Sequence, residues 1–144
     1  MKLRPVLVVH AEALVGELLG FAGPADQTVS RYFRAHRELG QNDRAFVAEA
    51  VYAVLRRRRS LAAAAESETP RALLLAALSR VQGLSVRALD GTLRPGESET
   101  LARARAAKEA IWPDAVRADL PDWLWQRLEA AQGPEQARRI ARGL

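Results

Sequence analysis

The chain has 144 residues, of which 49% are hydrophobic and 27% charged, and its formal net charge is +5. This composition fits one globular domain, or one domain with a small appendage, and argues against wholesale disorder. Cysteine is absent, which excludes a disulfide framework, a cysteine zinc site and a thiol nucleophile. Twenty of the 22 basic residues are arginine. Arginine suits phosphate contacts, but a GC-rich genome produces the same bias without any function.

The N-terminal part of the sequence predicts two helices. Apolar residues recur every three or four positions from Leu7 to Phe21, which is the period of one helix face, and Gly23 with Pro24 ends this segment. A second helix follows as far as Gly40, with a side that is apolar from Val29 onward.

A third helix is predicted from about Asn42 to about Arg59, where four consecutive arginines form its last turn. Apolar residues cover most of its circumference, so we expect this helix at the centre of the fold. The residues expected in the core at its C-terminal half are Val51, Val54 and Leu55.

The second half of the chain continues the helical pattern. Residues 62–67 are predicted to form a linker with frayed helix, and Thr69 followed by Pro70 is a strong helix start. Further helical segments are expected at residues 70–82, 85–90, 98–111, 121–132 and 134–144. Because no segment alternates like a strand, the predicted fold class is all-α.

Two clusters of arginines are the candidate binding residues for RNA phosphates. One lies on the second helix and the other closes the third, and the short connection between the helices predicts that the clusters share one electropositive patch. The alternative is that both are solvated helix faces. The candidate RNA-binding residues are Arg31, Arg34, Arg37, Arg56, Arg57, Arg58 and Arg59.

No catalytic or metal-binding motif is visible in the sequence. Glycine-rich phosphate loops, the H-E-x-x-H pattern and the G-x-S-x-G pattern are all missing. His36 has no second ligand at helix spacing and His10 is given no role, so no metal site and no catalytic residue are predicted. Trp123 and Trp125 are expected to anchor a helix in a core or at an interface rather than to stack on bases.

Targeting signals are also weak. The longest clean apolar run near the start, residues 5–9, is too short for a signal peptide, and no stretch approaches the roughly 20 apolar residues of a membrane span. We therefore expect a cytoplasmic protein with no membrane partner.

Two stretches of the sequence resemble a known family. Residues 37–58, RELGQNDRAFVAEAVYAVLRRR, are close to the family pattern L-G-x-x-D-R-A-F-V-A-E-x-V-Y-G-V-L-R-R. Residues 118–124, ADLPDWL, with residues 133–137, GPEQA, resemble a helix and the turn that follows it. The resemblance is to the NusB-like helical domain at the front of the RsmB/Sun family of bacterial ribosomal RNA (cytosine-5) methyltransferases.

This resemblance implies a NusB-like helical bundle over residues 1–112 and a helical linker over residues 113–144 that leads towards a catalytic domain. The family's cysteine nucleophile and S-adenosylmethionine site have no counterpart here, so the cofactor is expected only in a full-length enzyme of which this chain is an N-terminal fragment. Ala53 stands where the family has glycine.

The implied role is binding and positioning of ribosomal RNA, with the chain's own C-terminal catalytic domain as a second partner. The chain alone is not expected to be an enzyme. The alternatives are a protein-interaction module that uses the region of Trp123 and Trp125, or a stand-alone NusB-type antitermination protein. The latter is disfavoured because its arginine-rich N-terminus is reduced here to Lys2 and Arg4.

Overall fold

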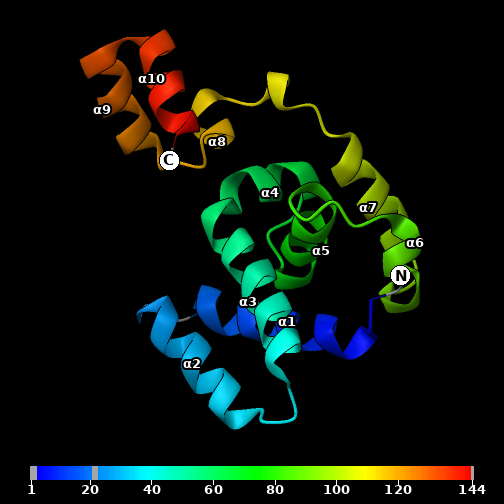
Figure 1. Cartoon of the computed structure of the whole chain (residues 1–144). Coiled ribbons are helices and arrows are strands. Elements are labelled where there is room, and N and C mark those ends of the chain that lie inside the picture. The colour runs from blue at the N-terminus through cyan, green and yellow to red at the C-terminus, as the bar shows by residue number, and fades with distance from the viewer. Residues whose placement is uncertain (1–2, 21–22, 144) are drawn as a thin grey trace.

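The computed structural model describes residues 3–20 and 23–143, and in these residues it contains α-helices and short 3-10 helices but no strand (Figure 1). The predicted all-α class is confirmed. Lys2 and Phe21 lie outside the described residues. The elements are α1 (Pro5–Gly20), α2 (Ala25–Ala35), α3 (Gln41–Arg56), α4 (Arg58–Ala65), α5 (Pro70–Arg80), α6 (Val86–Leu89), η1 (Asp90–Thr92), α7 (Glu97–Ala106), η2 (Glu109–Ile111), α8 (Asp114–Arg117), α9 (Asp122–Gln132) and α10 (Pro134–Arg142).

Helices α2 and α3 run in opposite directions and are linked by long side chains near both ends. At one end the hydroxyl of Tyr52 donates a hydrogen bond of 2.8 Å to Asp26. At the other end the Arg44 guanidinium lies 5.8 Å from the centre of the Phe33 ring. Helix α2 is shorter than predicted, since it ends at Ala35, and the chain turns before α3 begins.

The predicted third helix is interrupted within its arginine run. Arg57 leaves helical geometry, with φ −121° and ψ 29°, so that α3 ends at Arg56 and α4 begins at Arg58. The prediction of one continuous last turn is therefore wrong. The prediction of a linker at residues 62–67 is also wrong, because α4 extends to Ala65 and buries its apolar side against α5 and α7.

The most deeply buried helix is α5 rather than α3. Every residue from Leu73 to Leu78 is at most 2% exposed, and α1, α3, α4 and α7 all pack against this helix. Its predicted start is confirmed, since the Thr69 hydroxyl accepts a hydrogen bond from the amide of Ala72. Val51 and Val54 of α3 are fully buried as expected, whereas Leu55 is only half-buried.

A buried arginine ties four segments of this core together. The Arg71 guanidinium donates to both oxygens of Glu97, at 2.7 and 2.9 Å, and to Glu12 at 3.1 Å. It also donates to the carbonyl of Thr92 at 2.6 Å. These bonds join α5 to α1, η1 and α7, and they satisfy a charge that the fold has removed from water.

The Arg71 network predicts a loss of stability in acid. Hydrogen bonds from Arg71 hold the pKa of Glu97 below its ordinary value of 4.5. A carboxylate whose pKa is lowered by folding stabilises the protein above the unfolded pKa, and that contribution disappears as the pH falls through the folded pKa. We expect the free energy of unfolding to fall between about pH 5 and pH 3, and to fall less steeply in Glu97→Gln.

Urea denaturation across this pH range measures the effect. Glu99→Gln, an exposed carboxylate of the same helix, is the control and should follow the wild type. Equal pH slopes for wild type and Glu97→Gln would contradict the prediction.

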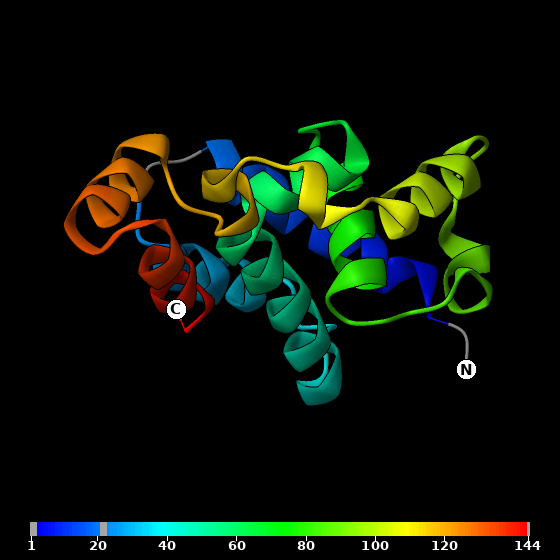
Figure 2. The ribbon, with the colours of Figure 1, turned by 90° about the horizontal axis from the view of Figure 1, so that it is seen from above.

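The C-terminal helices α8, α9 and α10 form a smaller cluster at one end of the molecule (Figures 1 and 2). Ala115, Trp125 and Ala137 are buried there, apart from the main core. Trp112 still packs against the main core, and the Arg80 guanidinium lies 5.3 Å from its ring centre. The division into a domain at residues 1–112 and a linker at 113–144 stays a prediction.

Candidate functional site

A cleft of about 450 Å³ lies where the junction of α3 and α4 faces the C-terminal helices. Its cationic wall comes from four places in the chain: the end of α3, the α3–α4 break, α8 and α10. Three carboxylates, those of Glu109, Asp114 and Asp119, also line it. We call this feature the arginine cleft and define it by Arg56, Arg57, Arg117, Trp125, Arg138 and Arg142.

Contacts at the start of α4 hold the two sides of the arginine cleft together. Arg57, the N-cap residue of α4, makes no side-chain capping hydrogen bond. Instead the Asp119 carboxylate accepts hydrogen bonds from the Ser60 amide at 2.7 Å and the Ser60 hydroxyl at 2.8 Å. Arg59 donates to the carbonyl of Leu120 at 2.7 Å and to Asp122 at 2.9 Å. The C-terminal helices are therefore docked on the first turn of α4, and burial raises the pKa of Asp119.

Asp114 orients two of the cleft arginines. Arg138 donates to its two oxygens at 2.9 and 3.0 Å, and Arg117 also donates to it. These hydrogen bonds lower the pKa of Asp114, and the one from Arg138 has the largest effect. Arg56 and Arg57 make no ion pair within residues 3–20 and 23–143, so their charges remain available to an anion in the cleft.

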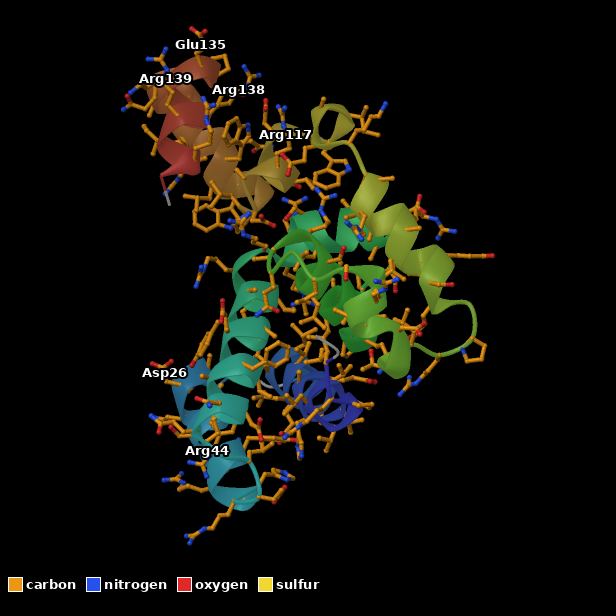
Figure 3. All side chains as sticks on the ribbon, turned by 45° about the vertical axis from the view of Figure 1, so that its right-hand side comes forward. Asp26, Arg44, Arg117, Glu135, Arg138 and Arg139 are labelled. Carbon is orange, nitrogen blue, oxygen red and sulfur yellow. The ribbon has the colours of Figure 1, made fainter. Side chains whose placement is uncertain are left out.

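The predicted arginine clusters do not form one patch. Arg34 and Arg37 line a second hollow, of about 540 Å³, together with Arg44, Ser30 and Phe33. Arg44 and Arg56 stand at opposite ends of α3, about 18 Å apart along its axis. Figure 3 shows Arg44 at one end of the molecule and Arg117 and Arg138 at the other. The expectation of a single electropositive patch is therefore wrong.

The seven arginines that were predicted to bind RNA therefore lie in different surroundings. Arg56 and Arg57 line the arginine cleft, and Arg58 is exposed beside it. Arg59 is engaged by Leu120 and Asp122, as described above. Arg31 is exposed on α2.

The two tryptophans of α9 also differ. Trp125 is 7% exposed, so the expectation of a core anchor is confirmed for it, and it forms part of the wall of the arginine cleft. Trp123 is 60% exposed, so it is not a core residue, and its expected place at an interface stays a prediction. Only one of the pair is turned into the small C-terminal core.

Sequence reasoning missed three arginines of the cleft. Arg138 and Arg142 are spaced by four on α10 and share a helix face, a pattern that the sequence does display. Arg117 had no comparable signal. None of these residues could be joined to Arg56 without knowing that the C-terminal helices dock on the first turn of α4 through Asp119.

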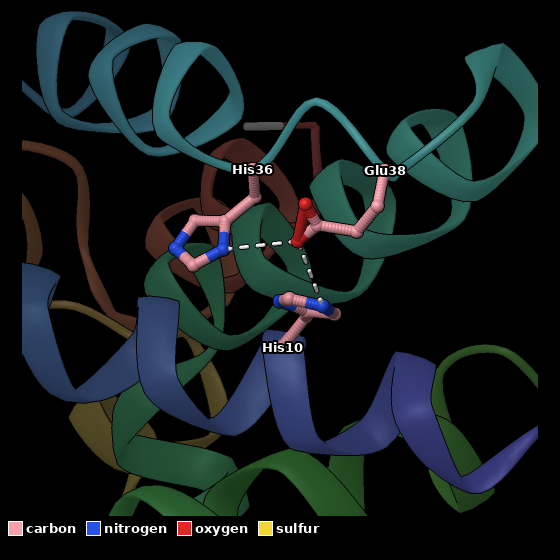
Figure 4. Close-up of side chains that lie close together, drawn as sticks. All are labelled: His10, His36 and Glu38. Atoms are coloured by element: carbon pink, nitrogen blue, oxygen red, sulfur yellow. Dashed lines mark hydrogen bonds and ion pairs between the residues drawn. The ribbon is translucent and has the colours of Figure 1, made fainter.

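The fold also gathers His10, His36 and Glu38, a cluster that the sequence did not suggest (Figure 4). His10 lies in the middle of α1, His36 ends α2, and Glu38 lies in the turn before α3. Sequence reasoning sought a second ligand on the same helix as His36. It missed this cluster because the second histidine, His10, lies on another helix.

The described residues thus define an all-α protein with an arginine-lined cleft, and none of their helices is long and apolar enough to cross a membrane. Comparison of the chain with known protein families, with curated proteins and with solved structures found no match.

Proposed function

We propose that this chain is an RNA-binding domain that positions ribosomal RNA for a cytosine-5 methyltransferase. The observation that carries the proposal is the arginine cleft, in which five guanidinium groups face three carboxylates and a tryptophan wall. The connection to a methyltransferase comes from the resemblance of residues 37–58, 118–124 and 133–137 to the NusB-like domain of the RsmB/Sun family.

Physical chemistry favours an RNA backbone as the occupant. Guanidinium groups are planar, always charged and able to hold phosphate oxygens in pairs. Because Asp114 already orients Arg117 and Arg138, less side-chain entropy is lost when phosphate arrives. Contacts of this kind fix the position and direction of an RNA without reading its bases.

The division of labour within the proposed enzyme follows from the residues present. Methyl transfer in the family needs a cysteine and S-adenosylmethionine, and this chain contains no cysteine. Its residues would bind and orient RNA, while a separate catalytic domain would hold the cofactor and carry out the chemistry.

Salt dependence of RNA binding tests the proposal. With about four phosphate contacts to a short single-stranded RNA, the logarithm of affinity should fall against the logarithm of salt concentration with a slope of about −3. The double variant Arg57→Ala with Arg142→Ala removes two exposed cleft charges and should reduce the slope to about −1.4. Fluorescence anisotropy across a salt series measures both slopes.

Two further double variants locate the site. Arg87→Ala with Arg127→Ala removes exposed charges outside the cleft and should leave the slope unchanged. Arg34→Ala with Arg37→Ala removes two positive charges from the lining of the second hollow. If this pair changes the salt slope and the cleft pair does not, the RNA binds at the α2–α3 end instead of in the arginine cleft. Absence of binding at low salt would refute RNA binding altogether.

A second candidate function is protein docking, which the 60% exposure of Trp123 favours. Its partner would be the chain's own catalytic domain or a ribosomal protein. Such an apolar contact would depend on Trp123 and would vary little with salt, whereas phosphate binding weakens steeply as salt rises.

A further inference from the structure

We infer that His10, His36 and Glu38 form a binding site for a divalent transition-metal ion of the zinc type. Nitrogen atoms of the two imidazoles and a carboxylate oxygen all lie within 4.8 Å of one another. The site joins the middle of α1 to the turn between α2 and α3 (Figure 4). It is separate from the arginine cleft and does not rest on the proposed RNA-binding function.

Two of the three ligand–ligand distances lie near the edge length of a tetrahedral zinc site. One oxygen of Glu38 lies 3.2 Å from Nδ1 of His36 and 3.7 Å from Nε2 of His10. In a tetrahedral zinc site with bonds of about 2.0–2.1 Å, two ligand atoms stand about 3.3–3.4 Å apart. The two measured distances lie on either side of that value.

Hydrogen bonding explains only one of the two contacts that Glu38 makes with the histidines. The contact of Glu38 with His36 is short enough for a hydrogen bond. The 3.7 Å separation from His10 is too long for one, although its ring is only 12% exposed. A metal ion between the three atoms would coordinate this nitrogen together with the Glu38 oxygen.

The surroundings of the two imidazoles resemble the supporting contacts of metal ligands. The other ring nitrogen of His10 lies 2.7 Å from the hydroxyl oxygen of Tyr32. When that nitrogen carries the proton and donates to Tyr32, the lone pair of Nε2 points to the Glu38 side, as metal binding requires. The Tyr32 ring also stacks on His36, with ring centres 4.1 Å apart, and so restrains the second ligand.

The donor set selects the class of ion. Two imidazoles with one carboxylate suit zinc and its neighbours in the first transition row, whereas magnesium and calcium prefer all-oxygen sites. Three protein ligands leave at least one position for water. Glu38 is 61% exposed, so an ion can enter from solvent. Glu38 would then be the last ligand to bind it.

Zinc titration of the chelator-treated protein is the direct test. Isothermal calorimetry should show one ion per chain, and visible absorption of bound Co²⁺ should report a tetrahedral or five-coordinate site. Glu38→Gln and His36→Gln should each weaken zinc binding at least tenfold. Tyr32→Phe, which removes only the hydroxyl next to His10, should weaken it by about ten- to a hundredfold, as loss of a ligand-supporting bond does.

The matched control is Glu49→Gln, an exposed carboxylate on α3 outside the cluster, which should bind zinc as the wild type does. Circular dichroism confirms that each variant is folded, and His36→Gln, altered at a half-exposed ring, keeps the test valid if a His10 variant fails to fold. No binding by the wild type, or equal binding by the wild type and both ligand variants, would overturn the inference.

Discussion

Replacing Arg71 with methionine is expected to lower the free energy of unfolding by about 3 kcal/mol, the lower end of the range for breaking a buried ion pair. Methionine fills much of the same space but leaves the carboxylates of Glu97 and Glu12 without their main partner. It also leaves the Thr92 carbonyl without its donor. The lower end applies because Glu97 and Glu12 keep partial access to water, with 19% and 29% of their side chains exposed.

Urea denaturation with an unchanged m value would measure this loss. Arg94→Met is the matched control, because Arg94 also reaches Glu12, at 3.5 Å, but is 60% exposed. Surface pairs of this kind contribute about 0–1 kcal/mol. Similar losses in the two variants would mean that burial of Arg71 has no special importance for the core.

Truncation of Leu74 to alanine is expected to cost about 2–5 kcal/mol, because its side chain is fully buried in α5 and a cavity would remain. Leu55→Ala removes the same atoms from a half-buried position on α3 and should cost about 1 kcal/mol, since most point mutations cluster near that value. Chemical denaturation of the two variants compares them under one condition. A larger loss for Leu55→Ala would show that α3, not α5, is the centre of the core.

Local signals in the sequence located helix starts well. Thr69 and Ser85 were both placed at helix starts, and each accepts a hydrogen bond from an amide three residues on. Such caps involve neighbours in the chain, so their chemistry is visible without a fold. The break at Arg57 was invisible for the opposite reason, because the group that caps α4 is Asp119, which lies 59 residues from Ser60.

The candidate sites follow the same rule. Arg56 and Arg57 were singled out by their own sequence neighbourhood, whereas Arg117 and Arg138 join them only through the docking of the C-terminal helices. His10 and His36 are likewise brought together by the packing of α1 against α2. Which helix occupies the centre also depended on tertiary packing, since both α3 and α5 are rich in apolar residues.

Asp119 belongs to two structures at once, since it caps α4 and lines the arginine cleft. The hydrogen bonds that stabilise the first turn of α4 therefore also hold the two sides of the cleft together. A change that loosens the cap would widen the cleft, and a ligand that bridges α10 and α3 would tighten the cap, because coupling between two equilibria is reciprocal. Part of the cost of ordering a binding surface is in this way met during folding, before any ligand arrives.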